Sequence, residues 1–551
     1  MRDALRTFVF HYVARGGGLL LVVCMHLFAV PGLVEPARGQ DTTITLSTAT
    51  IADLNAAFEA GTLDAEQLVI HSLNRIEAYD QSGPQLNAVL TVNPRAVERA
   101  RALDAERAAD GPRSLLHGIP VVLKDNVDTA DMPTTAGSFM LAGSLPPDDA
   151  FLVQKLRDAG AIVLAKLNMS EFASGGPMSS LGGSIRNPHN LERSPAGSSG
   201  GTGAAVAAAY APLGIGTDTG GSVRAPSSAN GIVGLKPTHG LLSRDGIVPL
   251  ALSFDTAGPM ARTVYDIAAA LNVMAGVDPA DDATQKAAGQ AEQDYTQFLD
   301  ADALDGAHIG VARDFMGSDP EVDWVVEAAL ETMRAAGATV VDVQIPSWVL
   351  EARGALYRTI RYREFRAQIA AYLSTLGPDY PKTLADLVDR SLTVTAPREE
   401  SVMPNPSRWS LMRREVESGE LTDRDYRAVR DHGLPLLRGM LDDVLAADDL
   451  DAIVYPTLPV RPERADADPD DGQVKAGSGR SAVTLANLTG FPDLIVPAGF
   501  TGRGLPVTIS FLGPAFSEPR LLALGFAFEQ RTQAHRLPEH TPLLPGDTRS
   551  N

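Results

Sequence analysis

Strand-length apolar runs alternate with helical segments along much of this chain, and this alternation limits the possible folds more than any other feature. Helical apolar spacing occurs at residues 65–79, 94–109 and 149–159. Short apolar runs typical of buried strands occur at residues 118–124, 161–167 and 212–217. Helices and strands that alternate in this way predict an α/β domain with a largely parallel or mixed sheet.

The middle of the chain has a different texture. Residues 275–450 carry more charge and longer helical stretches, including 321–336 and 423–446. Strand-like runs then resume at 451–456, 493–497 and 505–511. We therefore predict one large domain, residues 40–551, in which residues 275–450 form a variable helical wall or cap.

The first 39 residues resemble a leader. Arg2, Arg6 and Arg15 precede an apolar run over 19–34, and small residues at 37–39 offer a cleavage site. The run is shorter than the ~20 residues that a membrane-spanning helix needs. We predict a signal peptide over residues 1–39 and export to the periplasm or the exterior, with no membrane contact after cleavage. An uncleaved membrane anchor is the alternative.

The amino-acid composition limits which classes of partner and which kinds of catalytic chemistry fit this chain. Acidic residues outnumber basic ones by 68 to 47, giving a net charge of −21, which disfavours a nucleic-acid partner. The single cysteine, Cys24, lies in the predicted leader, so a mature chain would have no disulfide and no cysteine-based metal site. The histidines have no metal-ligand spacing, and we expect neither a metal nor another cofactor.

Two glycine-flanked serines, Ser198 and Ser222, carry the clearest chemical signal. Ser198 lies in G-S-S-G-G-T-G (197–203) and Ser222 in G-T-D-T-G-G-S-V-R (216–224). Glycine lets a ligand approach the backbone closely, and a hydroxyl beside converging N–H donors is suited to acyl transfer. A phosphate-binding loop is the alternative from a different class, although neither standard glycine-rich nucleotide motif is present.

A nucleophilic serine needs a base. Neither serine lies in G-x-S-x-G, and no lysine has a serine three residues before it. Lys124 ends an apolar strand, and burial there would lower its pKa by roughly 3–5 units from about 10.4, so that it accepts a proton near neutral pH. Snorkelling to the surface or pairing with Asp125 are the alternatives for Lys124. His117 and His239 are the only histidines placed to serve as a base instead.

Three long motifs closely resemble the amidase signature family. They are H-G-I-P-V-V-L-K-D-N-V (117–127), A-G-S-S-G-G-T-G-A-A-V-A (196–207) and G-T-D-T-G-G-S-V-R-A-P (216–226). The resemblance covers most of residues 45–545. It implies an α/β/α sandwich with a large twisted mixed sheet, and hydrolysis of small-molecule amides or peptide amides to an acid plus ammonia or an amine.

The resemblance also assigns roles. It implies a Ser–cis-Ser–Lys triad in which Ser222 is the nucleophile, Ser198 passes the proton and Lys124 is the base. The oxyanion hole would be formed by the N–H groups of Thr219, Gly220, Gly221 and Ser222. The backbone near Ala173 would bind substrate by lining the acyl pocket, and the supporting positions are Ser199, Asp218 and Arg224.

The same motifs occur in the glutaminase subunit of tRNA-dependent amidotransferases. That glutaminase is the closest alternative function, and the predicted leader and the acidic composition argue against it. The resemblance identifies neither the natural substrate nor the oligomeric state.

Overall fold

The computed structural model describes residues 43–395, 404–465 and 482–550. The predicted signal peptide, residues 1–39, lies outside the described residues, so export stays a prediction. In the part of the chain that is described, no helix is both long and apolar enough to cross a membrane.

A mixed sheet runs through the centre of the fold. Within the described residues it has eleven strands, in the spatial order β11-β10-β12-β14-β13-β8-β9-β7-β3-β4-β2. Their bounds are β2 (Val89–Val92), β3 (Pro120–Lys124), β4 (Ile162–Leu167), β7 (Leu213–Asp218), β8 (Val233–Lys236), β9 (Thr256–Ala261), β10 (His308–Ala312), β11 (Thr339–Val343), β12 (Ala452–Pro456), β13 (Asp493–Phe500) and β14 (Pro506–Leu512). β3 is parallel to β4 and β7, whereas β7, β9, β8, β13 and β14 form successive antiparallel pairs.

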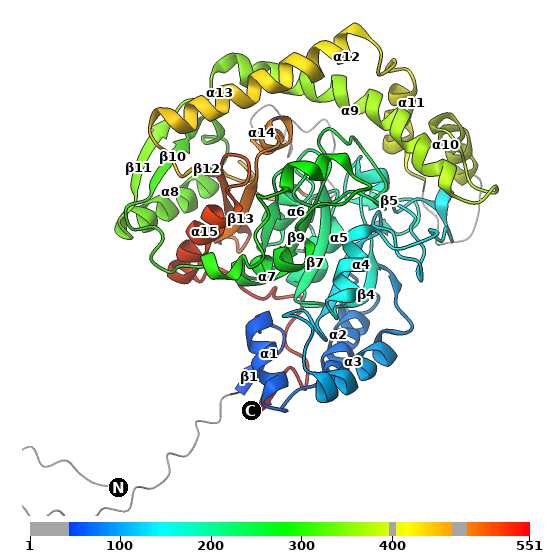
Figure 1. Ribbon diagram of the computed structural model, residues 1–551, viewed down its shortest axis with the longest axis vertical. Helices are drawn as coiled ribbons and strands as arrows, with labels where there is room; N and C mark the ends of the chain where they lie inside the picture. Colours follow the sequence, from blue (N-terminus) through cyan, green and yellow to red (C-terminus); the bar gives the residue numbers. More distant parts are fainter. Residues whose placement is uncertain (1–42, 396–403, 466–481, 551) are drawn as a thin grey trace, which may run out of the picture. The chain divides into compact units, whose positions relative to one another are not determined.

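Helices cover both faces of this sheet (Figure 1). On one face α5 packs against β7 and α6 against β8; on the other, α7 packs against β9 and α15 against β13, with α8 beside α15. Their bounds are α5 (Gly200–Ala207), α6 (Arg224–Ala229), α7 (Val264–Met274), α8 (Pro320–Ala335) and α15 (Glu518–Thr532). Because both faces are covered, β3, β4 and β7 are buried along their whole length, which is why they are continuous apolar runs. The predicted sandwich is confirmed.

Three helices predicted from apolar spacing are present in the N-terminal part. They are α2 (Ala65–Tyr79), α3 (Ala96–Asp110) and α4 (Phe151–Asp158). α2 begins after Asp64, whose carboxylate accepts the Gln67 N–H at 2.7 Å and so caps the first turn. The smaller elements are β1 (Thr43–Thr45), which pairs with β15 (Thr548–Ser550), α1 (Ile51–Glu59), and the hairpin of β5 (Met178–Ser179) and β6 (Gly183–Ser184).

The predicted helical wall begins later than residue 275, and this part of the prediction is wrong. β10 pairs in parallel with β11 and with β12, so residues 308–343 extend the sheet. α8 lies between β10 and β11 in the chain and makes the crossover that two parallel strands require. Both strands have only five residues, and β11 is largely unburied, so neither gives a strong apolar run in the sequence.

The wall itself starts at residue 347. Its helices are α9 (Ser347–Thr375), α10 (Leu384–Ser391), α11 (Pro406–Val416), α12 (Arg424–Ala428) and α13 (Leu434–Ala447). A π-helical turn, Val429–Gly433, joins α12 to α13, so the helix predicted over 423–446 is present with one irregular turn. Pro435, the second residue of α13, lacks the N–H that a regular helix uses there. In Figure 1, α9 and α13 lie along the same side of the sheet, and α14 (Val483–Thr489) contacts both.

Candidate active site

Two neighbouring parallel strands bring the predicted residues together. β3 ends at Lys124, and the adjacent β7 ends at Asp218, one residue after Thr217. Because parallel strands end at the same edge of a sheet, the loop that follows β7 lies beside Lys124. Ser198 completes the group, since it lies two residues before the start of α5, which packs against both strands.

Lys124 is fully buried and is hydrogen-bonded within this group. Its Nζ donates to Ser198 Oγ at 2.7 Å, to Thr217 Oγ1 at 2.7 Å and to the Thr217 carbonyl at 3.3 Å. Burial lowers the pKa of Lys124 to about 7, although Asp218 and Asp255 favour its charged form. An amine with that pKa is substantially neutral near pH 7 and can accept a proton.

The alternatives considered for Lys124 are wrong. Its side chain is completely buried, so it does not snorkel to the surface. The Asp125 carboxylate instead accepts hydrogen bonds from Thr135 and the Gly137 N–H, and lies 3.7 Å from Lys166 Nζ. Lys124 therefore faces the serines rather than its neighbour in sequence.

The two histidines that could have served as a base are occupied elsewhere. His117 Nε2 lies 2.9 Å from the Leu103 carbonyl, and His239 Nε2 lies 2.9 Å from the Leu252 carbonyl. Burial lowers the pKa of His239 to about 3, which makes it a poor proton acceptor.

The loops that carry the two serines are tied to each other. The peptide bond between Gly197 and Ser198 is cis, as the family resemblance implied, and the Ser198 side chain is buried. The Ser199 N–H donates to the Ser222 carbonyl at 3.2 Å, and the Ser170 N–H donates to the Ser198 carbonyl at 3.0 Å. The Ser222 hydroxyl is half-buried and makes no hydrogen bond to any other described residue. A hydroxyl in this state is open to a substrate, and its proton transfer to Ser198 stays a prediction.

The loop after β7 offers three of the four predicted oxyanion donors. The N–H groups of Thr219, Gly220 and Ser222 form no hydrogen bond with the residues that the structure describes. The Gly221 N–H, by contrast, donates to Asp218 Oδ1 at 2.8 Å, so the prediction that it contacts the oxyanion is wrong. Gly221 instead shapes the turn, because its φ of +112° lies in a region that favours glycine.

A buried charge network fixes this loop, as we expected for Asp218 and Arg224. The Asp218 carboxylate accepts hydrogen bonds from the Gly221 N–H and from Asn487 Nδ2, and it forms an ion pair with Arg224 at 3.1 Å. Arg224 also pairs with Asp493 at 2.8 Å. Burial raises the pKa of Asp218, but the Arg224 guanidinium outweighs that effect and holds this pKa well below its usual range. The carboxylate therefore stays charged and holds the loop at all relevant pH values.

Sequence reasoning did not identify Thr217, Asn126 or Asp255 as site residues. Thr217 Oγ1 accepts from Lys124 and from Asn126 Nδ2, the latter at 3.0 Å. Asp255 accepts the Thr219 hydroxyl at 2.5 Å, and its second oxygen accepts two backbone N–H groups. Thr217 and Asn126 lie inside the quoted motifs, which was a usable signal. Asp255 lies outside them and reaches Thr219 only through the pairing of β9 with β7.

The remaining predicted positions are close to this group. Ser199 Oγ donates to the Thr217 carbonyl at 3.2 Å, which braces the end of β7. Ala173 is buried and lines a small cavity together with Thr219 and Asp255. No three His, Cys, Asp or Glu side chains are grouped so as to hold a metal ion in the described part of the chain.

The helical wall reaches the oxyanion loop through Tyr357 of α9. A Cβ placed on Gly220 would lie 2.6 Å from the Tyr357 hydroxyl. The Tyr357 ring stacks on Phe254, with the ring centroids 5.4 Å apart and an interplanar angle of 17°. Tyr357 therefore packs closely on the oxyanion loop at Gly220 and leaves no room for a larger residue there.

The chain is similar to amidases and to one component of an amidotransferase. The family model described as Amidase matches residues 67–522. A glutamyl-tRNA(Gln) amidotransferase subunit from Halorhodospira halophila is 38% identical over 499 residues, which are 88% of this chain and 98% of that protein. The structure of native peptide amidase from Stenotrophomonas maltophilia superposes with a TM-score of 0.79 at 40% identity, over 90% of this chain and 99% of that one. A peptide amidase in complex with the competitive inhibitor chymostatin gives a TM-score of 0.80 at 40% identity, over 89% and 99% of the two chains.

Proposed function

We propose that this chain, which belongs to the amidase family, hydrolyses linear carboxamides to an acid and ammonia. The reaction proceeds through an acyl-enzyme on Ser222. One observation supports this chemistry more than any other. Lys124 is buried, has a pKa of about 7 and is hydrogen-bonded to Ser198 at 2.7 Å, and the Ser198 loop is tied to Ser222. A proton acceptor that is hydrogen-bonded to a second hydroxyl, on a loop tied to the backbone of the nucleophile, is suited to acyl transfer.

In the proposed reaction, neutral Lys124 takes the proton of Ser198, and Ser198 takes that of Ser222 as Ser222 Oγ attacks the amide carbon. The carbonyl oxygen becomes an oxyanion and accepts hydrogen bonds from the free N–H groups of the loop after β7. Each such donor is worth ~2.7–4 kcal/mol in the transition state. The proton then returns through Ser198 to the amide nitrogen as the C–N bond breaks. Water repeats the sequence on the ester and releases the acid.

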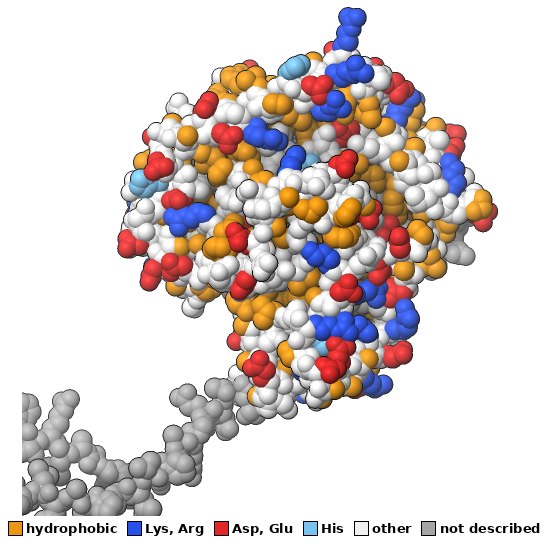
Figure 2. Space-filling model, in the orientation of Figure 1, with side chains coloured by type: hydrophobic (Ala, Val, Ile, Leu, Met, Phe, Trp, Pro, Cys, Tyr) orange, Lys and Arg blue, Asp and Glu red, His pale blue; other side chains and the backbone are white. Residues whose placement is uncertain are grey.

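Two substrate classes are candidates. The 40% identical structures are peptide amidases, which supports C-terminal carboxamides of peptides as substrates. The curated relatives, at 36–38% identity, are named as one subunit of glutamyl-tRNA(Gln) amidotransferase, which supports the glutaminase alternative. These names favour that alternative over an exported hydrolase. On the face shown in Figure 2, basic and acidic side chains are interspersed without a continuous basic surface.

Ammonia release by the purified full chain distinguishes these possibilities. We expect the chain alone to release ammonia from a small carboxamide, and Ser222→Ala to reduce the rate by at least about 10³-fold, because the nucleophile is lost. Ser82→Ala, on an exposed loop, is the control and should keep full activity. Near-normal turnover by Ser222→Ala would refute the proposal. Turnover of peptide amides without partners supports the first class, and turnover of glutamine only with added partner subunits supports the second.

A further inference from the structure

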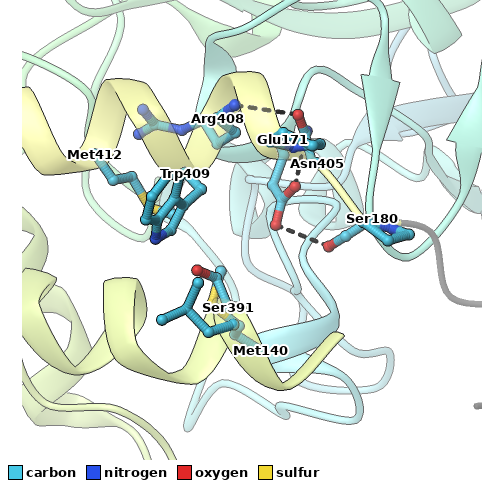
Figure 3. A pocket seen from close by; sticks show the side chains of 11 residues that line it. Met140, Glu171, Ser180, Ser391, Asn405, Arg408, Trp409 and Met412 are labelled. Carbon is cyan, nitrogen blue, oxygen red and sulfur yellow. Dashed lines mark hydrogen bonds between the residues drawn. The ribbon is translucent and has the colours of Figure 1, made fainter. Parts of the chain in front are cut away.

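A second cavity lies between the wall and the core, and neither the proposed triad nor the oxyanion loop uses it. It has a volume of about 230 Å³ and is lined by side chains from η1 (Phe139–Leu141), from η2 (Glu171–Ala173) and from the ends of α10 and α11. Most of its lining is apolar, including Met140, Trp409 and Met412 (Figure 3). We refer to it as the wall pocket. Its size suits one apolar side chain rather than a larger ligand.

Several polar atoms at the wall pocket have unused hydrogen-bonding capacity, including Arg408 Nε and Nη2, which are buried without an acceptor among the described residues. Trp409 Nε1 is buried and has no acceptor among the described residues, although a buried indole N–H normally finds one. One carboxylate oxygen of Glu171 accepts hydrogen bonds from the hydroxyls of Ser138 and Ser180, whereas the other accepts only one, from Asn405 Nδ2. This second oxygen can therefore accept a further hydrogen bond. In Figure 3 the Trp409 ring extends from α11 toward Ser391, and the Glu171 carboxylate points toward Ser180. Trp409 Nε1 and this Glu171 oxygen are a donor and an acceptor beside an apolar space, and they match the C=O and N–H of an amino-acid residue.

A short segment separates the wall pocket from the candidate active site. The Ser170 N–H donates to the Ser198 carbonyl at 3.0 Å, and the next residue, Glu171, lines the wall pocket. Ala173, two residues further on, lines the cavity beside Thr219. Because neighbouring Cα atoms are about 3.8 Å apart, a ligand that occupies both places needs to span only a few residues of extended peptide.

The wall pocket has a rigid frame. Arg408 of α11 is fully buried and donates to both oxygens of Glu415, at 2.9 and 3.1 Å. Its guanidinium lies 4.8 Å from the centre of the Phe365 ring on α9, and Arg361 also pairs with Glu415. α11 is therefore fixed to α9 by buried charge pairs, so a ligand finds the pocket already formed.

We propose that the wall pocket binds an apolar residue of a peptide-amide substrate, upstream of the carboxamide that is cleaved. Trp409 Nε1 donates to the carbonyl of that residue, and Glu171 accepts its N–H. The inference rests on the proposed amide hydrolysis, since it places one substrate across both sites. It assigns the selectivity for the acyl side to α11 and η2.

The test compares a peptide amide that carries a leucine upstream of the carboxamide residue with a small amide such as propionamide, which cannot reach the pocket. Trp409→Phe keeps an aromatic, though smaller, side chain and removes the donor, and should lower kcat/KM for the leucine peptide amide by about 3- to 10-fold, mostly through KM. Ser391→Phe fills the pocket and should lower it by about 10- to 100-fold. Both variants should hydrolyse propionamide at the wild-type rate. Trp324→Phe, an exposed tryptophan on α8, is the matched control.

A binding measurement separates this inference from the proposed function. Ser222→Ala should bind the leucine peptide amide in calorimetry, and Ser222→Ala/Ser391→Phe should bind it at least about 10-fold more weakly. Unchanged binding and unchanged selectivity in both pocket variants would overturn the inference while propionamide hydrolysis still supports the function. If no amide is hydrolysed at all, the proposed function fails, and the inference fails with it.

Discussion

The hydroxyl of Thr219 provides a sharp test of how the oxyanion loop is held. It donates to Asp255 at 2.5 Å in a buried environment, and the other oxygen of Asp255 is held by the N–H groups of Leu250 and Ala251. The substitution Thr219→Val keeps the shape of the side chain and removes this single hydrogen bond. The loop then loses its contact with Asp255, the residue before β9, while the Asp218–Arg224 attachment stays intact.

The magnitude follows from the charge of the acceptor. A hydrogen bond to a charged group contributes about 1.5–3 kcal/mol, which corresponds to about 10- to 150-fold in rate. The loss should fall on kcat with little change in KM, because in the proposed reaction the Thr219 and Gly220 N–H groups bind the oxyanion more strongly than the ground-state carbonyl.

The assay is steady-state hydrolysis of a small amide, with the thermal unfolding midpoint measured in parallel. Thr508→Val is the matched control, since Thr508 is a buried threonine whose hydroxyl donates to Ser228 Oγ at 2.7 Å, away from the loop. It should reduce stability with little effect on kcat. An unchanged kcat in Thr219→Val, or a rise in KM alone, would show that Asp255 does not position the oxyanion donors.

Two further predictions concern the wall and the core beneath it. Gly220→Ala should lower kcat by about 10-fold or more, because its Cβ would lie 2.6 Å from the Tyr357 hydroxyl. The effect on kcat should be smaller in a Tyr357→Ala background, and an equal effect in both backgrounds would contradict this contact. Burial raises the pKa of Asp128 to about 7, whereas its unfolded pKa is about 3.9. The free energy of unfolding therefore falls as the pH rises from about 3.9 toward 7, because only the unfolded chain loses the proton over this range. Asp128→Asn should therefore raise the unfolding midpoint at about pH 8 but not at about pH 4, and equal shifts at both pH values would disprove the assignment.

The candidate catalytic group was predictable because its members lie in local motifs. Lys124 ends an apolar run, and Ser198 and Ser222 are flanked by glycines, so short stretches of sequence carry the chemistry. Strand burial made Lys124 a candidate base while its alternatives stayed open, and the family resemblance then assigned it that role. The structure shows that the strands on both sides of β3 cover Lys124.

Tertiary contacts explain what the sequence did not reveal. Asp255 and Tyr357 reach the oxyanion loop from β9 and α9, far from the motifs, and no local pattern distinguishes them from other acids and tyrosines. Gly221 was predicted as a donor because it stands in the glycine-rich loop, whereas its N–H is taken by a carboxylate three residues earlier. β11 escaped detection because it lies at the sheet edge and is largely unburied, and β10 beside it has a buried run of only four residues.

The pH dependence of kcat/KM for a small amide tests the central claim most directly, since Lys124 must be neutral to accept a proton. The profile between about pH 5 and about pH 9 should rise with a slope of one and an apparent pKa near 7, the value to which burial lowers that of Lys124. Lys124→Met should reduce kcat/KM by at least about 10³-fold and remove this rise. A profile that is flat over this range in the wild type, or a Lys124→Met variant that keeps the same rise, would contradict the assignment of Lys124 as the base.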